Sequence, residues 1–181
     1  QAFEILCHYP AQEISYTKLL GQLQDRGNTD LVKHYISLYQ SAFMFHALEK
    51  YSTKAWRRRG SSPKMLPACP ALYSMHQSRR AMDDPERRGR VFELAVGAEL
   101  AQQPGTLYYW RAGTAEVDFI YAHREALYAI EVKSGRRKSD KGLTAFTEQV
   151  PSAIPVILTP ERFGAFSKDP IAFLERIGGT H

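Results

Sequence analysis

The chain has 181 residues, of which 44% are apolar and 24% charged, a balance typical of folded globular proteins and unlike that of disordered ones. Lys and Arg outnumber Asp and Glu by 24 to 19, and the net charge of +5 permits contact with nucleic acid without requiring it. No stretch approaches the roughly 20 apolar residues that span a bilayer, and two cysteines do not support a disulfide-built secreted fold, so we expect a cytoplasmic protein without membrane contact.

The first part of the chain has the pattern of two helices followed by two short strands. Ser15 and Asn28 have short polar side chains that accept hydrogen bonds from the free amides at the start of a helix. The expected elements are helices at 16–23 and 31–42 and strands at 43–48 and 64–69. This order is typical of a winged helix-turn-helix, which we assign to residues 1–78.

The second part of the chain changes in character after a connector at 70–84, which lacks clear periodicity. Asp84 and Pro85 suit the start of a long helix, because aspartate caps the first turn and proline is tolerated at its first position. Three strands, a helix, a strand and a last helix follow. The seven elements are expected at 85–103, 107–111, 116–122, 126–133, 142–149, 154–158 and 170–177. This order predicts an α/β (α+β) fold with a mixed central sheet over residues 79–181.

Charged side chains alternate with apolar ones in the second of the three strands. Because successive side chains of a strand point to opposite faces, Glu116 and Asp118 are expected on one face. Val117 and Phe119 are expected on the other face. The strand therefore predicts one polar surface and one buried surface.

The next strand adds a glutamate and a lysine to the same constellation. Glu131 and Lys133 share a face, and the short polar link at 123–125 predicts a hairpin that brings them close to Asp118. Mg²⁺ prefers carboxylate oxygens, so Asp118 and Glu131 suit a metal site, and the lysine can hold a phosphate or orient a water. The spacing matches the PD-(D/E)xK nuclease signature, with Asp118, Glu131 and Lys133 as catalytic candidates. Glu93 on the preceding helix is the candidate third metal ligand.

A purely structural interpretation accounts for the same residues. A hairpin with alternating exposed charges and a cross-strand ion pair would give this pattern without any chemistry. Glu93 lies among apolar residues and is equally explained as the flank of a packed helix. A fold can also persist after its activity has been lost.

Basic residues gather in several short clusters along the chain. Six of these residues are predicted to contact nucleic-acid phosphates without reading sequence: Arg57, Arg58, Arg59, Arg136, Arg137 and Lys138. Solvated surface loops are the alternative interpretation of each cluster.

Several segments together resemble the C-terminal half of a family of prokaryotic AAA+-type P-loop ATPases. They are ISYTKLL (14–20), GNT (27–29), KHYI (33–36), AFM (42–44), SPKM (62–65), GRVFE (89–93), YYWR (108–111), AEVDF (115–119) and IEVKSG (130–135). The resemblance implies an upstream ATPase domain, then a winged helix, then a restriction-endonuclease-like domain of unproven function.

The ATPase domain itself is not expected within this sequence. The chain contains no G-x-x-x-x-G-K-[ST] motif and does not begin with methionine. We therefore expect a C-terminal fragment, with ATP bound only by the upstream domain, which would also be a partner of this region.

Two functions remain open from the sequence. The first is a DNA-associated module with a Mg²⁺-dependent phosphodiesterase site. The second is a catalytically inactive nuclease-like scaffold that binds a protein partner or regulates the ATPase domain.

Overall fold

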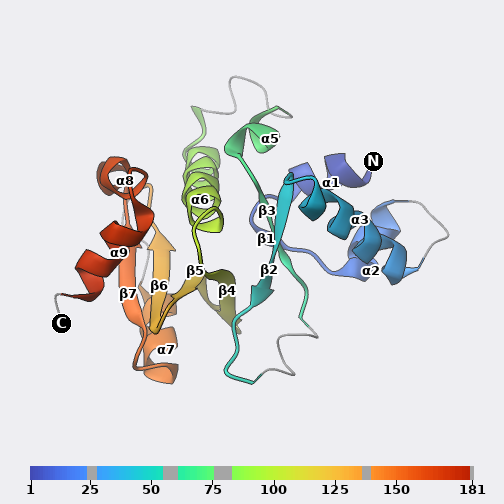
Figure 1. Cartoon of the computed structure of the whole chain (residues 1–181). Helices are drawn as coiled ribbons and strands as arrows, with labels where there is room; N and C mark the ends of the chain where they lie inside the picture. Colours follow the sequence, from blue (N-terminus) through green and yellow to red (C-terminus); the bar gives the residue numbers. More distant parts are fainter. Residues whose placement is uncertain (24–27, 55–60, 76–82, 136–139, 180–181) are drawn as a thin grey trace.

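The structure is a computed structural model that describes residues 1–23, 28–54, 61–75, 83–135 and 140–179 (Figure 1). The basic clusters predicted to bind nucleic acid, at 57–59 and 136–138, lie outside the described residues, so their role stays a prediction. Among the described residues, no helix has the length and apolar character needed to cross a membrane.

Three helices form the N-terminal layer. They are α1 (Ala2–His8), α2 (Tyr16–Gln22) and α3 (Thr29–Ser41). Ser15 caps α2 by accepting a hydrogen bond from Lys18 N at 3.2 Å, and Asn28 caps α3 by accepting from two backbone amides. Apolar residues of all three helices pack against β2 (Phe45–Lys50) and β3 (Lys64–Pro67) in one cluster.

The strand predicted at 43–48 begins two residues later than expected. Phe43 has a positive φ of 54° and is 82% exposed, and Met44 N donates to Tyr39 O at 2.9 Å, so the chain turns there before it extends. The connector predicted at 70–84 begins with a short helix, α5 (Pro70–Ser74). Its five residues are too few to produce a helical period in the sequence.

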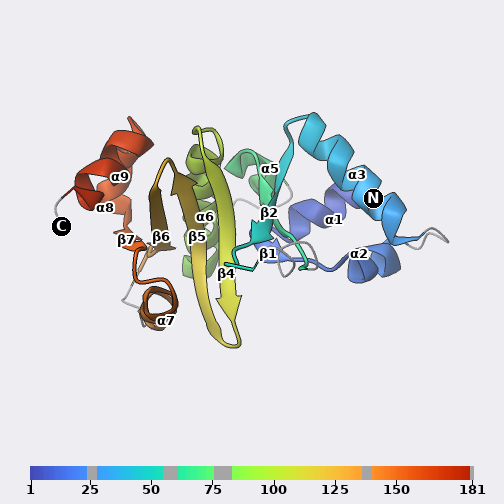
Figure 2. The same ribbon diagram turned by 60° about the horizontal axis from the view of Figure 1, so that its bottom comes forward.

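In the part of the chain that the structure describes, seven strands form one mixed sheet (Figures 1 and 2). The other strands are β1 (Gln12–Glu13), β4 (Thr106–Ala112), β5 (Ala115–His123), β6 (Ala126–Val132) and β7 (Ile154–Leu158). Their order across the sheet is β1-β3-β2-β4-β5-β6-β7, with parallel pairing of β2 with β4 and of β6 with β7. The mixed α/β fold expected from the sequence is therefore confirmed.

The pairing of β2 with β4 joins the two predicted regions, 1–78 and 79–181, into one sheet. Glu49 and Lys50 pair with Tyr108 and Tyr109, and Tyr51 N donates to Tyr109 O at 2.7 Å. Continuous backbone hydrogen bonding across this seam holds the N-terminal strands beside the C-terminal ones.

Helices cover both faces of the C-terminal half of the sheet (Figure 2). On one face, α6 (Pro85–Ala101) packs in a cluster with α8 (Pro160–Phe166) and α9 (Pro170–Gly178). On the other face, α7 (Lys141–Gln149) packs through Leu143 and Phe146 onto Trp110 and Ala129. The helix α8 lies just after β7 and was not expected from the sequence.

A β-bulge in β5 changes which side chains face each helix layer. Trp110 pairs with Val117, whereas Tyr108 pairs with Ile120, so β5 has one extra residue between these pairs. Val117 consequently packs in the α7 cluster and Phe119 in the α6 cluster. The prediction that Val117 and Phe119 share a face is therefore wrong, because strict alternation assumes a ladder without a bulge.

We expect Gly142→Ala to destabilise the protein, because Gly142 of α7 lies directly against the backbone of β5. A Cβ there would overlap with the backbone oxygen of Glu116, and overpacking of this kind lowers the free energy of unfolding by about 1–3 kcal/mol. Gly164→Ala on α8 is the matched control, because a Cβ there meets nothing within 4 Å and better helix propensity should stabilise by about 0.5–1 kcal/mol. Urea unfolding of both variants tests this, and equal effects would contradict the packing argument.

Candidate active site

A pocket of about 650 Å³ lies between the N-terminal turns of α6 and the adjoining ends of β5 and β6. Its lining is mostly charged or polar. It consists of Pro85, Glu86, Gly89, Arg90, Glu93, Glu116, Asp118, Glu131, Val132, Lys133, Ser134 and Gly135. The structure therefore brings the four residues predicted for catalysis and metal binding, Glu93, Asp118, Glu131 and Lys133, to the wall of one cavity.

Asp118 owes its position to the bulge of β5. The β5–β6 ladder ends at the pair Phe119 and Ile130, and beyond it Asp118 Oδ2 accepts a hydrogen bond from Val132 N at 2.8 Å. The side chain of Asp118 thus takes the place of a backbone acceptor. This bond orients the carboxylate at the end of the β5–β6 ladder.

Glu131 and Lys133 are paired with each other at the end of β6. Lys133 Nζ donates to Glu131 Oε1 at 2.6 Å. The side chain of Lys133 is only 10% exposed and that of Glu131 only 16%. The other glutamate oxygen, Oε2, is buried and has no hydrogen-bond partner among the described residues. A buried acceptor without a donor is costly, so this oxygen suits a ligand that supplies positive charge.

Lys64 is the site residue that the sequence did not reveal. It lies in β3, within the region predicted as the wing, and is 2% exposed. Its Nζ donates to Glu93 Oε1 at 2.9 Å and to the backbone oxygen of Asp118 at 3.3 Å, and it lies 5.3 Å from the centre of the Phe119 ring. A lysine at the start of an apolar run was the available signal, but its partners are distant in sequence.

Glu93 is held by two cations. Lys64 Nζ donates to its Oε1, and Arg90 Nη1 donates to its Oε2 at 2.8 Å. Among the described residues, no group of three His, Cys, Asp or Glu side chains is arranged to hold a metal ion. The assignment of Glu93 as a third ligand therefore stays a prediction, and a metal ion there would compete with these ion pairs.

Crowding of buried carboxylates alters the acid–base properties of the pocket. Burial, with further repulsion from Glu93 and Glu131, raises the pKa of Asp118 to about 8 despite the attraction of Lys64. Burial also raises the pKa of Glu131 above its ordinary value, against the opposing effect of Lys133. Burial lowers the pKa of Lys64, but Glu93 and Asp118 outweigh it and hold that pKa above the ordinary value. The pocket thus favours added protons or another source of positive charge.

Residues 88–168 match the model of a protein family described as a domain of unknown function, DUF4143. The matched segment runs from α6 to the end of α8 and contains Glu93, Asp118, Glu131 and Lys133, but not Lys64. No curated protein and no solved structure matches the chain.

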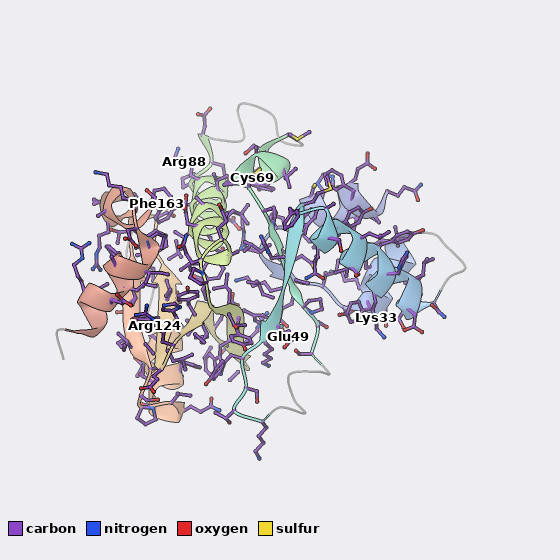
Figure 3. All side chains as sticks on the ribbon, viewed as in Figure 1. Lys33, Glu49, Cys69, Arg88, Arg124 and Phe163 are labelled. Atoms are coloured by element: carbon purple, nitrogen blue, oxygen red, sulfur yellow. The ribbon has the colours of Figure 1, made fainter. Side chains whose placement is uncertain are left out.

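We expect Lys64→Met to lower the free energy of unfolding by about 3–5 kcal/mol, because it leaves the buried Glu93 with one cation fewer. Glu93→Leu in the Lys64→Met background should recover part of the loss. Lys33→Met is the control: Lys33, labelled in Figure 3, lies on α3 and forms an exposed pair with Asp30 that contributes little to stability. Urea unfolding that gives equal losses for both lysines would contradict the buried role of Lys64.

The raised pKa of Asp118 predicts a pH dependence of stability in the presence of a chelator. The folded chain holds this proton more tightly than the unfolded chain, whose aspartate has its ordinary pKa near 3.8, so stability should fall as the pH rises from about 4 through about 8. Asp118→Asn keeps an oxygen for Val132 N but cannot ionise, so its unfolding free energy should decline less over this window. Parallel curves for the two proteins would show that Asp118 does not titrate in this window.

Proposed function

We propose that this pocket is a Mg²⁺-dependent phosphodiesterase site and that the chain is a nucleic-acid-associated module. The observation that carries the proposal is the convergence of Asp118, Glu131 and Lys133 on one pocket whose buried Glu131 Oε2 has no partner among the described residues. Two carboxylates can hold a hard cation, and an ammonium group can bind a phosphate oxygen, so this set suits hydrolysis of a phosphodiester.

The donor set suits a divalent cation. Asp118 and Glu131 offer oxygen ligands, and the raised pKa values of both acids indicate that their charges are incompletely compensated. These two residues would hold the ion, and Glu93 would join them in competition with its ion pairs to Lys64 and Arg90. Bound Mg²⁺ would supply positive charge next to the scissile phosphate.

The chain's own cations have distinct roles in this proposal. Lys133, at the end of β6, would orient the attacking water or hold a phosphate oxygen. Arg90, whose side chain is 30% exposed at the rim, would bind the substrate phosphate while it remains close to Glu93. Both cations already line the pocket, where Lys133 is paired with Glu131 and Arg90 with Glu93.

The finer architecture belongs to the same proposal. The order of α6, three antiparallel strands, α7 and a parallel β7 supports a PD-(D/E)xK nuclease-like domain. The helices α2 and α3 followed by the β2–β3 pair support a winged helix-turn-helix. The resemblance to the C-terminal half of AAA+-type ATPases supports an ATPase domain as the partner of this module in a longer protein.

A specific observation favours an inactive scaffold as the second candidate. Both oxygens of Glu93 and one oxygen of Glu131 are already paired with side-chain cations, which stand where a metal ion would otherwise compensate the acids. In this interpretation the ion pairs stabilise the fold, and the nuclease-like domain binds a protein partner.

A nicking assay on DNA and RNA with Mg²⁺ or Mn²⁺ separates the two functions. We expect cleavage that Asp118→Asn and Lys133→Ala each reduce by about two orders of magnitude or more, because each removes a group that acts on the reacting phosphate. Glu125→Gln is the matched control, since it removes an exposed carboxylate at the opposite end of the same hairpin. Absence of cleavage by the unmodified protein, with and without ATP in the longer protein, would overturn the enzymatic proposal in favour of the scaffold.

A further inference from the structure

A second pocket, of about 500 Å³, lies where the ends of β2, β4 and α7 meet. These elements come forward in Figure 2. Its lining consists of Lys50, Tyr51, Ser52, Thr53, Ser61, Trp110, Arg111, Ala112, Phe146, Gln149 and Val150. Among the described residues, none lines both this pocket and the candidate active site. The function proposed above therefore leaves this cavity unexplained.

Aromatic rings form one side of the pocket. Phe146 packs edge-on against Tyr51, with ring centroids 5.5 Å apart, and against Trp110 at 5.2 Å. Phe146 and Trp110 are buried in the α7 cluster, and Tyr51 packs partly buried against it. Because Phe146 and Trp110 are almost fully buried, Tyr51 is the most accessible ring of this fixed apolar wall.

The remainder of the lining is mostly polar, and its charged side chains are cations, whereas those of the candidate active site are mostly acids. Lys50 and Arg111 contribute two positive charges, and no carboxylate lines the pocket among the described residues. Five carboxylates line the candidate active site. Arg111 approaches Glu13 at 3.3 Å and Glu116 at 4.0 Å, but its side chain is 48% exposed, so these are weak surface pairs that an anion can replace.

We propose that this pocket binds a nucleotide, with the base against the aromatic wall and the phosphate on Lys50 and Arg111. Three features favour this ligand class: a wall of edge-packed aromatic rings, adjacent cations, and hydroxyl and amide groups of Ser52, Thr53 and Gln149 that can bond a base or sugar. The volume lies within the range of small-ligand sites. The inference goes beyond the phosphodiesterase proposal and does not depend on it.

The chain offers a direct reporter of this binding. It has two tryptophans, Trp56 and Trp110, so Trp56→Phe leaves the pocket residue Trp110 as the only indole. The fluorescence of this variant is followed during titration with AMP, UMP, adenosine and ribose 5-phosphate at constant ionic strength. We expect saturable changes with both nucleotides, an affinity for adenosine about tenfold or more weaker than that for AMP, and no saturable change with ribose 5-phosphate.

Variants in the same background locate the ligand. Arg111→Ala should raise the Kd for AMP by about tenfold or more, and Ala112→Phe should block binding by filling the pocket. Arg124→Ala is the matched control: Arg124, labelled in Figure 3, lies in the turn between β5 and β6 and is likewise paired with a carboxylate, that of Glu175. If Arg111→Ala fails to fold, Ala112→Phe decides the question.

Three results would overturn the proposal, and none depends on nuclease activity. The first is the absence of a saturable change with either nucleotide. The second is equal binding of AMP and ribose 5-phosphate, which would show a site for anions alone. The third is unchanged AMP affinity in Ala112→Phe, which would place the nucleotide elsewhere.

Discussion

The buried ion pair between Lys64 and Glu93 is the interaction on which the arrangement of the site depends. It joins β3, near one edge of the sheet, to α6, which covers the other half. Removing two charges from water costs several kcal/mol per ion, and the cost is offset here by close geometry and by further bonds from Arg90 and to the backbone of Asp118. A pair of this kind tolerates little displacement, so it fixes the N-terminal strands against α6. Gly97 permits the same close approach, because a side chain there would meet Phe119 and Leu66.

Local signals predicted much of the fold, because caps and strand patterns act over a few residues. Ser15, Asn28 and Asp84 each accept a backbone hydrogen bond at the start of the helix that the sequence assigned to them. Features that depend on distant residues were missed. The bulge in β5 depends on how β4 pairs with it, and the two-residue strand β1 exists only because β3 lies beside it. The sequence does not show either partner.

In the candidate site, too, local sequence signals predicted some features, whereas contacts between distant residues were missed. Asp118, Glu131 and Lys133 belong to one hairpin, so alternation and a short turn were enough to suggest that they lie close together. The charged groups around these three residues could not be predicted from the hairpin. Lys64 and Glu93 are 29 residues apart and meet only when β3 packs under α6. The raised pKa of Asp118 arises from this packing: burial is its main cause, and Glu93 is the next. A sequence motif therefore indicates which groups gather, but not which protonation states they hold.

The charges of the two pockets are linked through one strand pair. Arg111 and Glu116 are partners in the β4–β5 register, and Arg111 lines the nucleotide pocket whereas Glu116 lines the acidic one. If a phosphate draws Arg111 away, Glu116 loses a counter-charge, and the acidic pocket becomes more negative. A more negative pocket attracts a cation more strongly, so under the two proposals an anion in one pocket favours a metal ion in the other. The ladder that separates the pockets thus also connects them, through the pair that Arg111 and Glu116 form across it.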